Sequence, residues 1–137
     1  MNVTRIVIPP TYKKENGVWT LNIEEIVLPF PIAKKSIVSI PPGKMGGNHT
    51  HAKTELFIAL TQGLCLAWKK EDGTIKRVSM KQNDTIIGWI VPEGVSHVVI
   101  NTSDSEGILL EIADKDVRMT TKDIVIDENE MTDLQID

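Results

Sequence analysis

All three histidines of this 137-residue chain lie in two short segments that also contain acidic residues and glycines. The first segment, residues 43–63, reads G-x5-H-x-H-x3-E-x7-G and contains His49, His51 and Glu55. The second segment, residues 92–101, reads P-x-G-x2-H-x3-N and contains His97. Neutral imidazole can take up and return a proton near pH 7. Three imidazoles and one carboxylate also suit a first-row divalent metal ion, with positions left open for water or substrate.

The elements that carry these residues must bring them together from different strands. Side chains alternate across a strand, so His49 and His51 point to the same face. Glu55 follows after a short break, where a turn can bring its carboxylate back toward both imidazoles. His97 comes from a separate hairpin, just after a Pro-Glu-Gly turn. We therefore expect the four side chains to converge in one pocket.

Aromatic side chains in the neighbouring apolar runs are candidates for the wall of this pocket. Phe57 shares a strand face with Glu55, and Trp68 and Trp89 stand in adjacent apolar segments. Small-molecule sites commonly combine an apolar lining with a few convergent polar groups. The alternative for both tryptophans is packing in the core or at a subunit interface, where large aromatic side chains are common.

Short strand signals separated by turn signals recur along the chain. We expect strands at residues 5–8, 18–27, 36–40, 54–61, 64–70, 74–80, 85–91, 95–101 and 107–112. The dipeptide Asp72-Gly73 between two alternating runs is a strong hairpin signal. No segment shows a convincing 3.6-residue apolar period, so the pattern predicts an all-β sandwich or barrel.

The pair of histidine motifs resembles the signature of the cupin superfamily. The resemblance implies a single-domain all-β cupin fold, which is a double-stranded β-helix or jelly-roll barrel. We expect residues 1–113 to form the barrel with its N-terminal strands. Residues 114–137 form an acidic C-terminal tail, which we expect to belong to the same domain or to a subunit contact.

Within the cupins, residues 27–113 resemble the sugar 3,4-ketoisomerases that act on dTDP-4-keto-6-deoxyglucose. The similar features are a P-F-x-I-K-like entry at residues 29–34, the segment 46–52, the Asp-Gly hairpin and the segment 88–97. The resemblance implies that His49 and His51 act as catalytic acid and base beside a ketone, without a metal ion.

The chain departs from this family at three positions. The family's arginine before Gly-x-His falls at Gly46 here, and its tryptophan before the last histidine is Ser96. Its tyrosine in the preceding strand has no match, because residues 36–40 contain none. Arginine is well suited to bidentate contact with a diphosphate, so its absence bears on substrate identity.

Three functions are compatible with these motifs. The first is an isomerase or epimerase that acts on a keto-sugar, which the resemblance implies is linked to a nucleotide, with His51 as base and His49 as its partner. The second is a metal-dependent cupin, an oxygenase or isomerase in which His49, His51, Glu55 and His97 bind Fe, Mn, Ni or Zn. The third is a cupin that binds a ligand without catalysis.

Composition narrows the setting in which the protein works. No run approaches the ~20 apolar residues that span a membrane, no secretory signal is visible, and no basic stripe with interleaved aromatics suggests nucleic acid. The single cysteine, Cys65, suits a reducing cytoplasm, and its apolar surroundings favour a core residue over a nucleophile. We expect a cytoplasmic homodimer with a small-molecule substrate, because barrels of this size leave apolar edges for a second subunit.

Overall fold

The computed structural model describes residues 2–82, 85–117 and 120–122, with the side chains of all of these except residues 48, 49, 51 and 120–122. Within this part of the chain the regular structure is β-strand apart from one short 3₁₀ helix, so the predicted all-β class is confirmed. None of the described residues forms a helix with the length and apolar character needed to cross a membrane.

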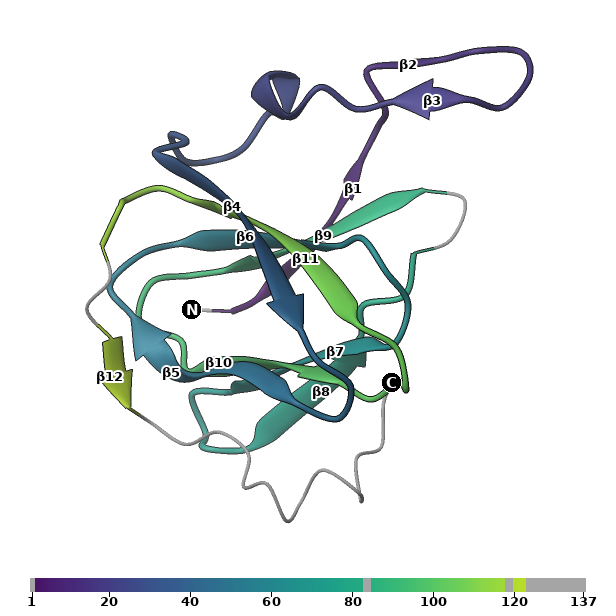
Figure 1. The fold of residues 1–137 in the computed structure, drawn as a ribbon. Helices are drawn as coiled ribbons and strands as arrows, with labels where there is room; N and C mark the ends of the chain where they lie inside the picture. Colours follow the sequence, from purple (N-terminus) through teal and green to yellow (C-terminus); the bar gives the residue numbers. More distant parts are fainter. Residues whose placement is uncertain (1, 83–84, 118–119, 123–137) are drawn as a thin grey trace.

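Two five-stranded antiparallel sheets lie one above the other (Figure 1). In spatial order, the first sheet contains β1 (Thr4–Ile8), β9 (Ile86–Val91), β6 (Glu55–Ala59), β11 (Gly107–Ala113) and β4 (Lys34–Ile40). The second sheet contains β12 (Thr120–Lys122), β5 (Met45–His51), β10 (His97–Asn101), β7 (Leu64–Lys69) and β8 (Ile75–Ser79). Neighbouring strands in each sheet are distant in sequence, as in a jelly roll.

Strand alternation decides which residues meet between the sheets. Along β7, Leu66 and Trp68 face the core between the two sheets, whereas Cys65 and Ala67 belong to a separate cluster with residues of β10. Cys65 is fully buried, and this burial raises the pKa of its thiol to about 11. The expectation that Cys65 is a core residue is therefore confirmed.

The hairpin between β7 and β8 forms where the Asp-Gly signal predicted it. The carboxylate of Asp72 accepts hydrogen bonds from the backbone N–H and the hydroxyl of Thr74, at 2.9 and 2.6 Å. Gly73 adopts a φ of +87°, a conformation that side-chain-bearing residues rarely adopt. These two residues fix the register between β7 and β8, the two strands at one edge of the second sheet.

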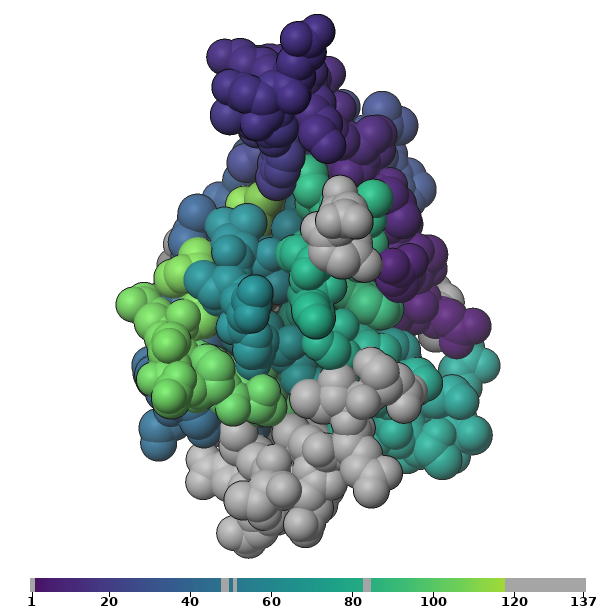
Figure 2. Space-filling view, turned by 90° about the vertical axis from the view of Figure 1, so that its right-hand side faces the viewer, coloured from purple at the N-terminus to yellow at the C-terminus, as the bar shows by residue number. Residues whose placement is uncertain are grey.

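The N-terminal region departs from the sequence-based expectation. The predicted strand at residues 18–27 is wrong: only β3 (Trp19–Thr20) is extended there, paired with β2 (Tyr12–Lys13), and a 3₁₀ helix follows at Ile23–Glu25. Apolar residues of this stretch pack on the outer face of the first sheet, among them Leu21 and Ile26. The β2–β3 hairpin projects beyond both sheets (Figures 1 and 2).

Candidate functional site

The two histidine-bearing segments form neighbouring strands. β5 and β10 pair antiparallel, and the backbone of His49 lies opposite that of His97. A bulge follows His97 in this pairing. Beside it, the hydroxyls of Thr50 and Ser96 are hydrogen bonded at 2.6 Å, which ties β5 to the turn before β10. The pairing explains why two motifs separated by a long stretch of chain belong to one site.

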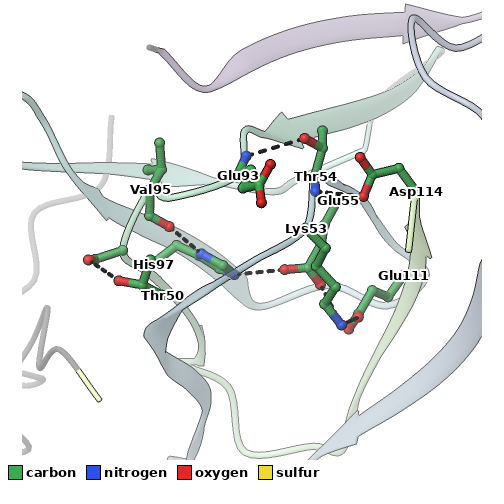
Figure 3. Close-up of polar contacts among 10 residues, drawn as sticks. Thr50, Lys53, Thr54, Glu55, Glu93, Val95, His97, Glu111 and Asp114 are labelled. Carbon is green, nitrogen blue, oxygen red and sulfur yellow. Dashed lines mark hydrogen bonds and ion pairs between the residues drawn. The ribbon is translucent and has the colours of Figure 1, made fainter. Parts of the chain in front are cut away.

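The imidazole of His97 is held in one orientation by the backbone of Val95, two residues earlier (Figure 3). Its Nδ1 lies 2.9 Å from the carbonyl oxygen of Val95. A carbonyl can only accept a hydrogen bond, so Nδ1 carries the proton and donates it. The other ring nitrogen, Nε2, lies 3.4 Å from Oε1 of Glu55. The imidazole therefore presents Nε2 to the space between the sheets, as a group for proton transfer or ligand binding.

Glu55 belongs to a buried cluster of charged side chains. Its Oε2 lies 3.8 Å from Nζ of Lys53, and the same ammonium lies 3.3 Å from Oε1 of Glu111. Glu55 is 1% exposed and Lys53 is 5% exposed, so both charges are shielded from water. Because buried charges are costly unless paired, these contacts hold the three side chains in fixed positions.

Glu111 is a member of this cluster whose acidity is altered. Burial, followed by the adjacent Glu55 carboxyl, raises the pKa of Glu111 to about 7, although the Lys53 ammonium acts in the opposite direction. A carboxyl with a pKa near 7 can exchange a proton at neutral pH, which is common in sites that perform acid–base chemistry.

A cavity of about 150 Å³ opens beside this cluster. Among the described residues that line it, the polar side chains are those of Glu55, His97 and Glu111. The remaining lining comes from apolar side chains and two glycines: Val38, Ile40, Gly46, Gly47, Phe57, Val99 and Leu109. The cavity lies between both sheets, with three polar groups converging on an otherwise apolar wall, which is the usual character of a small-molecule site.

The structure brings some of the predicted site residues together and separates others. Glu55, His97 and Phe57 all line the cavity, and the Phe57 and His97 rings lie 5.5 Å apart. The side chains of His49 and His51 lie outside the described residues, so their roles stay predictions. Among the other described residues, no group of three or more His, Cys, Asp or Glu side chains is arranged to hold a metal ion.

Trp68 and Trp89 do not lie among the residues that line this cavity. Their rings pack against each other with centroids 6.4 Å apart, inside the core between the sheets. This position matches the core-packing alternative for the two tryptophans. Trp68 lies directly opposite His97 on the neighbouring strand β7, so the tryptophan pair packs in the core next to the site.

Lys53 and Glu111 were not recognised from the sequence. Glu111 is the only charged residue in the strand Gly107–Ala113, and a charge in so apolar a run was the available signal. Lys53 stands two residues after the H-x-H motif but gave no comparable signal, because lysines in turns are usually solvated.

Several other motif residues have structural roles. Asn101 is fully buried, and its amide donates to the carbonyl oxygens of Ile40 and Ser105, at 2.9 and 2.7 Å. At Gly63, a Cβ would lie 2.5 Å from the Cβ of Ser103, so no larger residue fits without a shift. At Gly46, a Cβ would lie 3.3 Å from Cδ1 of Ile40, so the end of the Ile40 side chain would have to shift slightly to admit a larger residue.

Comparisons with known proteins place this geometry in context. No family model matches the chain, and no curated protein matches its sequence. Among solved structures, a 3,4-ketoisomerase from Helicobacter canadensis superposes with a TM-score of 0.68 at 18% identity, covering 96% of this chain and 95% of that one. QdtA, a sugar 3,4-ketoisomerase from Thermoanaerobacterium thermosaccharolyticum in complex with TDP, gives 0.67 at 16% identity, covering 85% and 83%.

A larger protein shares part of the fold. The capsular polysaccharide assembling protein CapF from Staphylococcus aureus matches with a TM-score of 0.53 at 20% identity, covering 60% of this chain. The chain spans only 24% of the length of CapF. At these identities the likeness is one of fold. The cupin fold predicted from the two histidine motifs is thereby confirmed.

Proposed function

We propose that this protein is a cupin-fold isomerase that acts on a keto-sugar linked to a nucleotide, by proton transfer through histidine. The observation that carries the proposal is the convergence of His97, Glu55 and Glu111 on one small cavity beside the H-x-H strand. The fold shared with sugar 3,4-ketoisomerases supports the substrate class.

The size of the cavity agrees with a sugar ring. A cavity of about 150 Å³ can hold a ring the size of benzene. It cannot also hold a nucleoside diphosphate, which must then lie outside the space between the sheets. Gly46 and Gly47 line the cavity without side chains, so the backbone of β5 can approach the ring closely.

The proposed reaction moves a carbonyl group between two neighbouring carbons and needs no oxidant or reductant. A base, His51 in this proposal, takes the proton from C3 while the C4 carbonyl oxygen gains a proton from solvent, which gives an enediol. The C3 hydroxyl then returns a proton to solvent as it becomes the new carbonyl, C4 gains a proton from His49, and proton exchange with solvent restores both histidines. His97, fixed by Val95, would orient the ketone or its enediol from the adjacent strand.

Incubation with dTDP-4-keto-6-deoxyglucose in D₂O tests the proposal. We expect conversion to the 3-keto isomer, with deuterium incorporated at the reacting carbons, followed by NMR. His49→Ala and His51→Ala should each lower turnover by roughly 10²- to 10⁴-fold. Glu24→Gln, at an exposed residue on the N-terminal 3₁₀ helix, is the control that keeps full activity. Absence of both conversion and deuterium exchange in the wild type would refute the proposal.

A metal-dependent cupin is the second candidate, favoured by the orientation of His97. Anchoring Nδ1 on a backbone carbonyl directs Nε2 toward the carboxylate of Glu55, 3.4 Å away, so both side chains face one point, as two metal ligands would. His49, His51, Glu55 and His97 would then hold Fe, Mn, Ni or Zn, which would polarise a carbonyl or activate oxygen. Lys53 and Glu111 already engage Glu55, so its carboxylate is shared with an ion pair and is a less independent ligand.

Metal analysis of the purified protein separates the two candidates. If Glu55 is a ligand, Glu55→Gln should weaken metal binding by about 10- to 100-fold. If the protein is a metal-free isomerase, the same substitution lowers turnover with no metal to lose. Equal and substantial metal content in wild type and Glu55→Gln would leave the three histidines as the ligand set.

A cytoplasmic homodimer completes the proposal. The exposed large apolar side chains gather on the β2–β3 hairpin, the segment that follows it and the outer face of the first sheet: Val7, Tyr12, Val18, Trp19, Val27, Ile37 and Leu60. In a two-fold dimer the same patch meets itself, so the projecting hairpin of one subunit can cover the sheet face of the other. Light scattering at micromolar concentration tests this state.

A further inference from the structure

We propose that Glu111, held in place by Lys53, binds a hydroxyl group of the sugar ring and so determines whether the ring enters the cavity. This inference rests on the proposed function and names a residue that neither histidine motif contains. Glu111 comes from β11 in the first sheet, opposite the second sheet that carries both motifs' histidines.

The position of the Glu111 carboxylate supports direct contact with a ligand. It lines the cavity together with His97 and Glu55, whereas Lys53, its partner, does not. One Glu111 oxygen lies 3.3 Å from the Lys53 ammonium, and the side chain remains 18% exposed. A carboxyl held by a buried cation at the edge of an apolar cavity has a fixed direction, which favours a specific hydrogen bond over a diffuse charge effect.

The charge of the cluster favours hydroxyl groups over phosphate. Glu55 and Glu111 are two carboxyls served by one Lys53 ammonium. A phosphate placed here would bring further negative charge into a poorly hydrated space where two carboxyls already share one cation, which is unfavourable. A ring hydroxyl can instead donate to Glu111, and the cavity walls of Val38 and Leu109 can pack on the ring's carbon atoms.

Substitution of Glu111 should leave the fold intact. Without the Glu111 charge, Lys53 and Glu55 still form an ion pair, so no buried charge loses its last partner. Glu111→Met removes the hydrogen bond while keeping a side chain of similar size. Glu111→Gln keeps a hydrogen-bonding group without the charge. Glu24→Gln removes an exposed carboxylate away from the cavity and serves as the matched control.

Calorimetric titration with two stable probes, dTDP and dTDP-glucose, tests the assignment. The quantity to compare is the dissociation constant of dTDP divided by that of dTDP-glucose. This ratio measures what the sugar ring adds to binding. We expect dTDP-glucose to bind the wild type more tightly than dTDP. Glu111→Met should lower the ratio roughly 10-fold or more, as expected for a lost hydrogen bond to a charged group. The affinity of Glu111→Met for dTDP should stay the same or increase. The ratio for Glu111→Gln should lie between those of the wild type and Glu111→Met.

Each remaining outcome counts against a specific claim. An unchanged ratio in Glu111→Met, or an equal loss of affinity for both probes, overturns the role of Glu111, because a merely structural residue would affect both alike. Equal binding of the two probes by the wild type overturns ring entry but leaves nucleotide recognition standing. If the wild type binds neither probe while Glu24→Gln behaves identically, the proposed function itself fails, and this inference fails with it.

Discussion

Two hollows of this molecule differ in both size and chemistry. The inner cavity, between the sheets, measures about 150 Å³ and gathers Glu55, His97 and Glu111. The outer groove, between the first sheet and the β2–β3 hairpin, measures about 610 Å³ and is lined mostly by apolar side chains such as Trp19, Ile37 and Leu60. The smaller hollow has the reactive groups and the larger one has the exposed apolar surface. Volume alone therefore does not identify the site.

The difference follows from which face of a strand each residue occupies. On β4, Val38 faces the inner cavity and its neighbour Ile37 faces the outer groove. On β11, Glu111 likewise faces the inner cavity and its neighbour Leu110 faces the outer groove. The inner charges are shielded from solvent, so each depends on its charged partners. Exposed apolar side chains of the groove contact water instead, and burying them against another protein surface would be favourable.

The largest expected effect is on folding stability, at the inner cavity. Lys53→Met leaves two buried carboxyls without their cation and should cost about 3–5 kcal/mol. Lys13→Met, in the outer groove, should change stability by no more than about 0.5 kcal/mol. Urea unfolding followed by tryptophan fluorescence measures both variants. Similar losses in the two would contradict the view that the inner charges form one interdependent cluster.

A smaller effect is expected on self-association, at the outer groove. Trp19 is 51% exposed, so Trp19→Ser removes little of the subunit's own packing. If the groove is the dimer interface, the substitution should weaken the dimer by at least about 10-fold, as for a central aromatic side chain in an interface. Light scattering across a dilution series measures this, with Glu93→Gln as a control outside the groove. An unchanged dissociation constant would place the interface elsewhere.

The third expected effect is a pH dependence of folding stability that belongs to Glu111. Its pKa is raised from 4.5 to about 7 in the folded state by burial and by the facing Glu55 carboxyl, against the opposing effect of Lys53. Between these values the folded protein keeps a proton that the unfolded chain releases, so this group's contribution to stability falls as pH rises.

Comparison of Glu111→Gln with the wild type isolates this contribution. The wild type should lose stability relative to the variant between about pH 4.5 and about pH 7, with no further relative change above that range. Urea midpoints across this range measure the difference. Parallel pH profiles for the two proteins would mean that Glu111 titrates alike in the folded and unfolded states.

The sequence alone determined the fold class and most of the strands, because turn residues and period-2 alternation act over a few neighbouring residues. Asp72-Gly73 forms the predicted hairpin, and the alternation of Cys65 with Leu66 separates the two faces of β7 as expected. The stretch 18–27 misled the prediction because its apolar residues, although partly alternating, pack on the outside of the first sheet through a 3₁₀ turn.

Only the tertiary structure decided how the site is completed. His97 and Glu55 could be paired from their motifs, but Lys53 and Glu111 meet through the packing of a turn against β11, far along the chain. Trp68 and Trp89, which the sequence left open between a pocket wall and core or interface packing, lie in the core, because the packing of the two sheets places them against each other. Local spacing specifies which face a side chain occupies, whereas its neighbours across the core depend on how non-adjacent strands assemble.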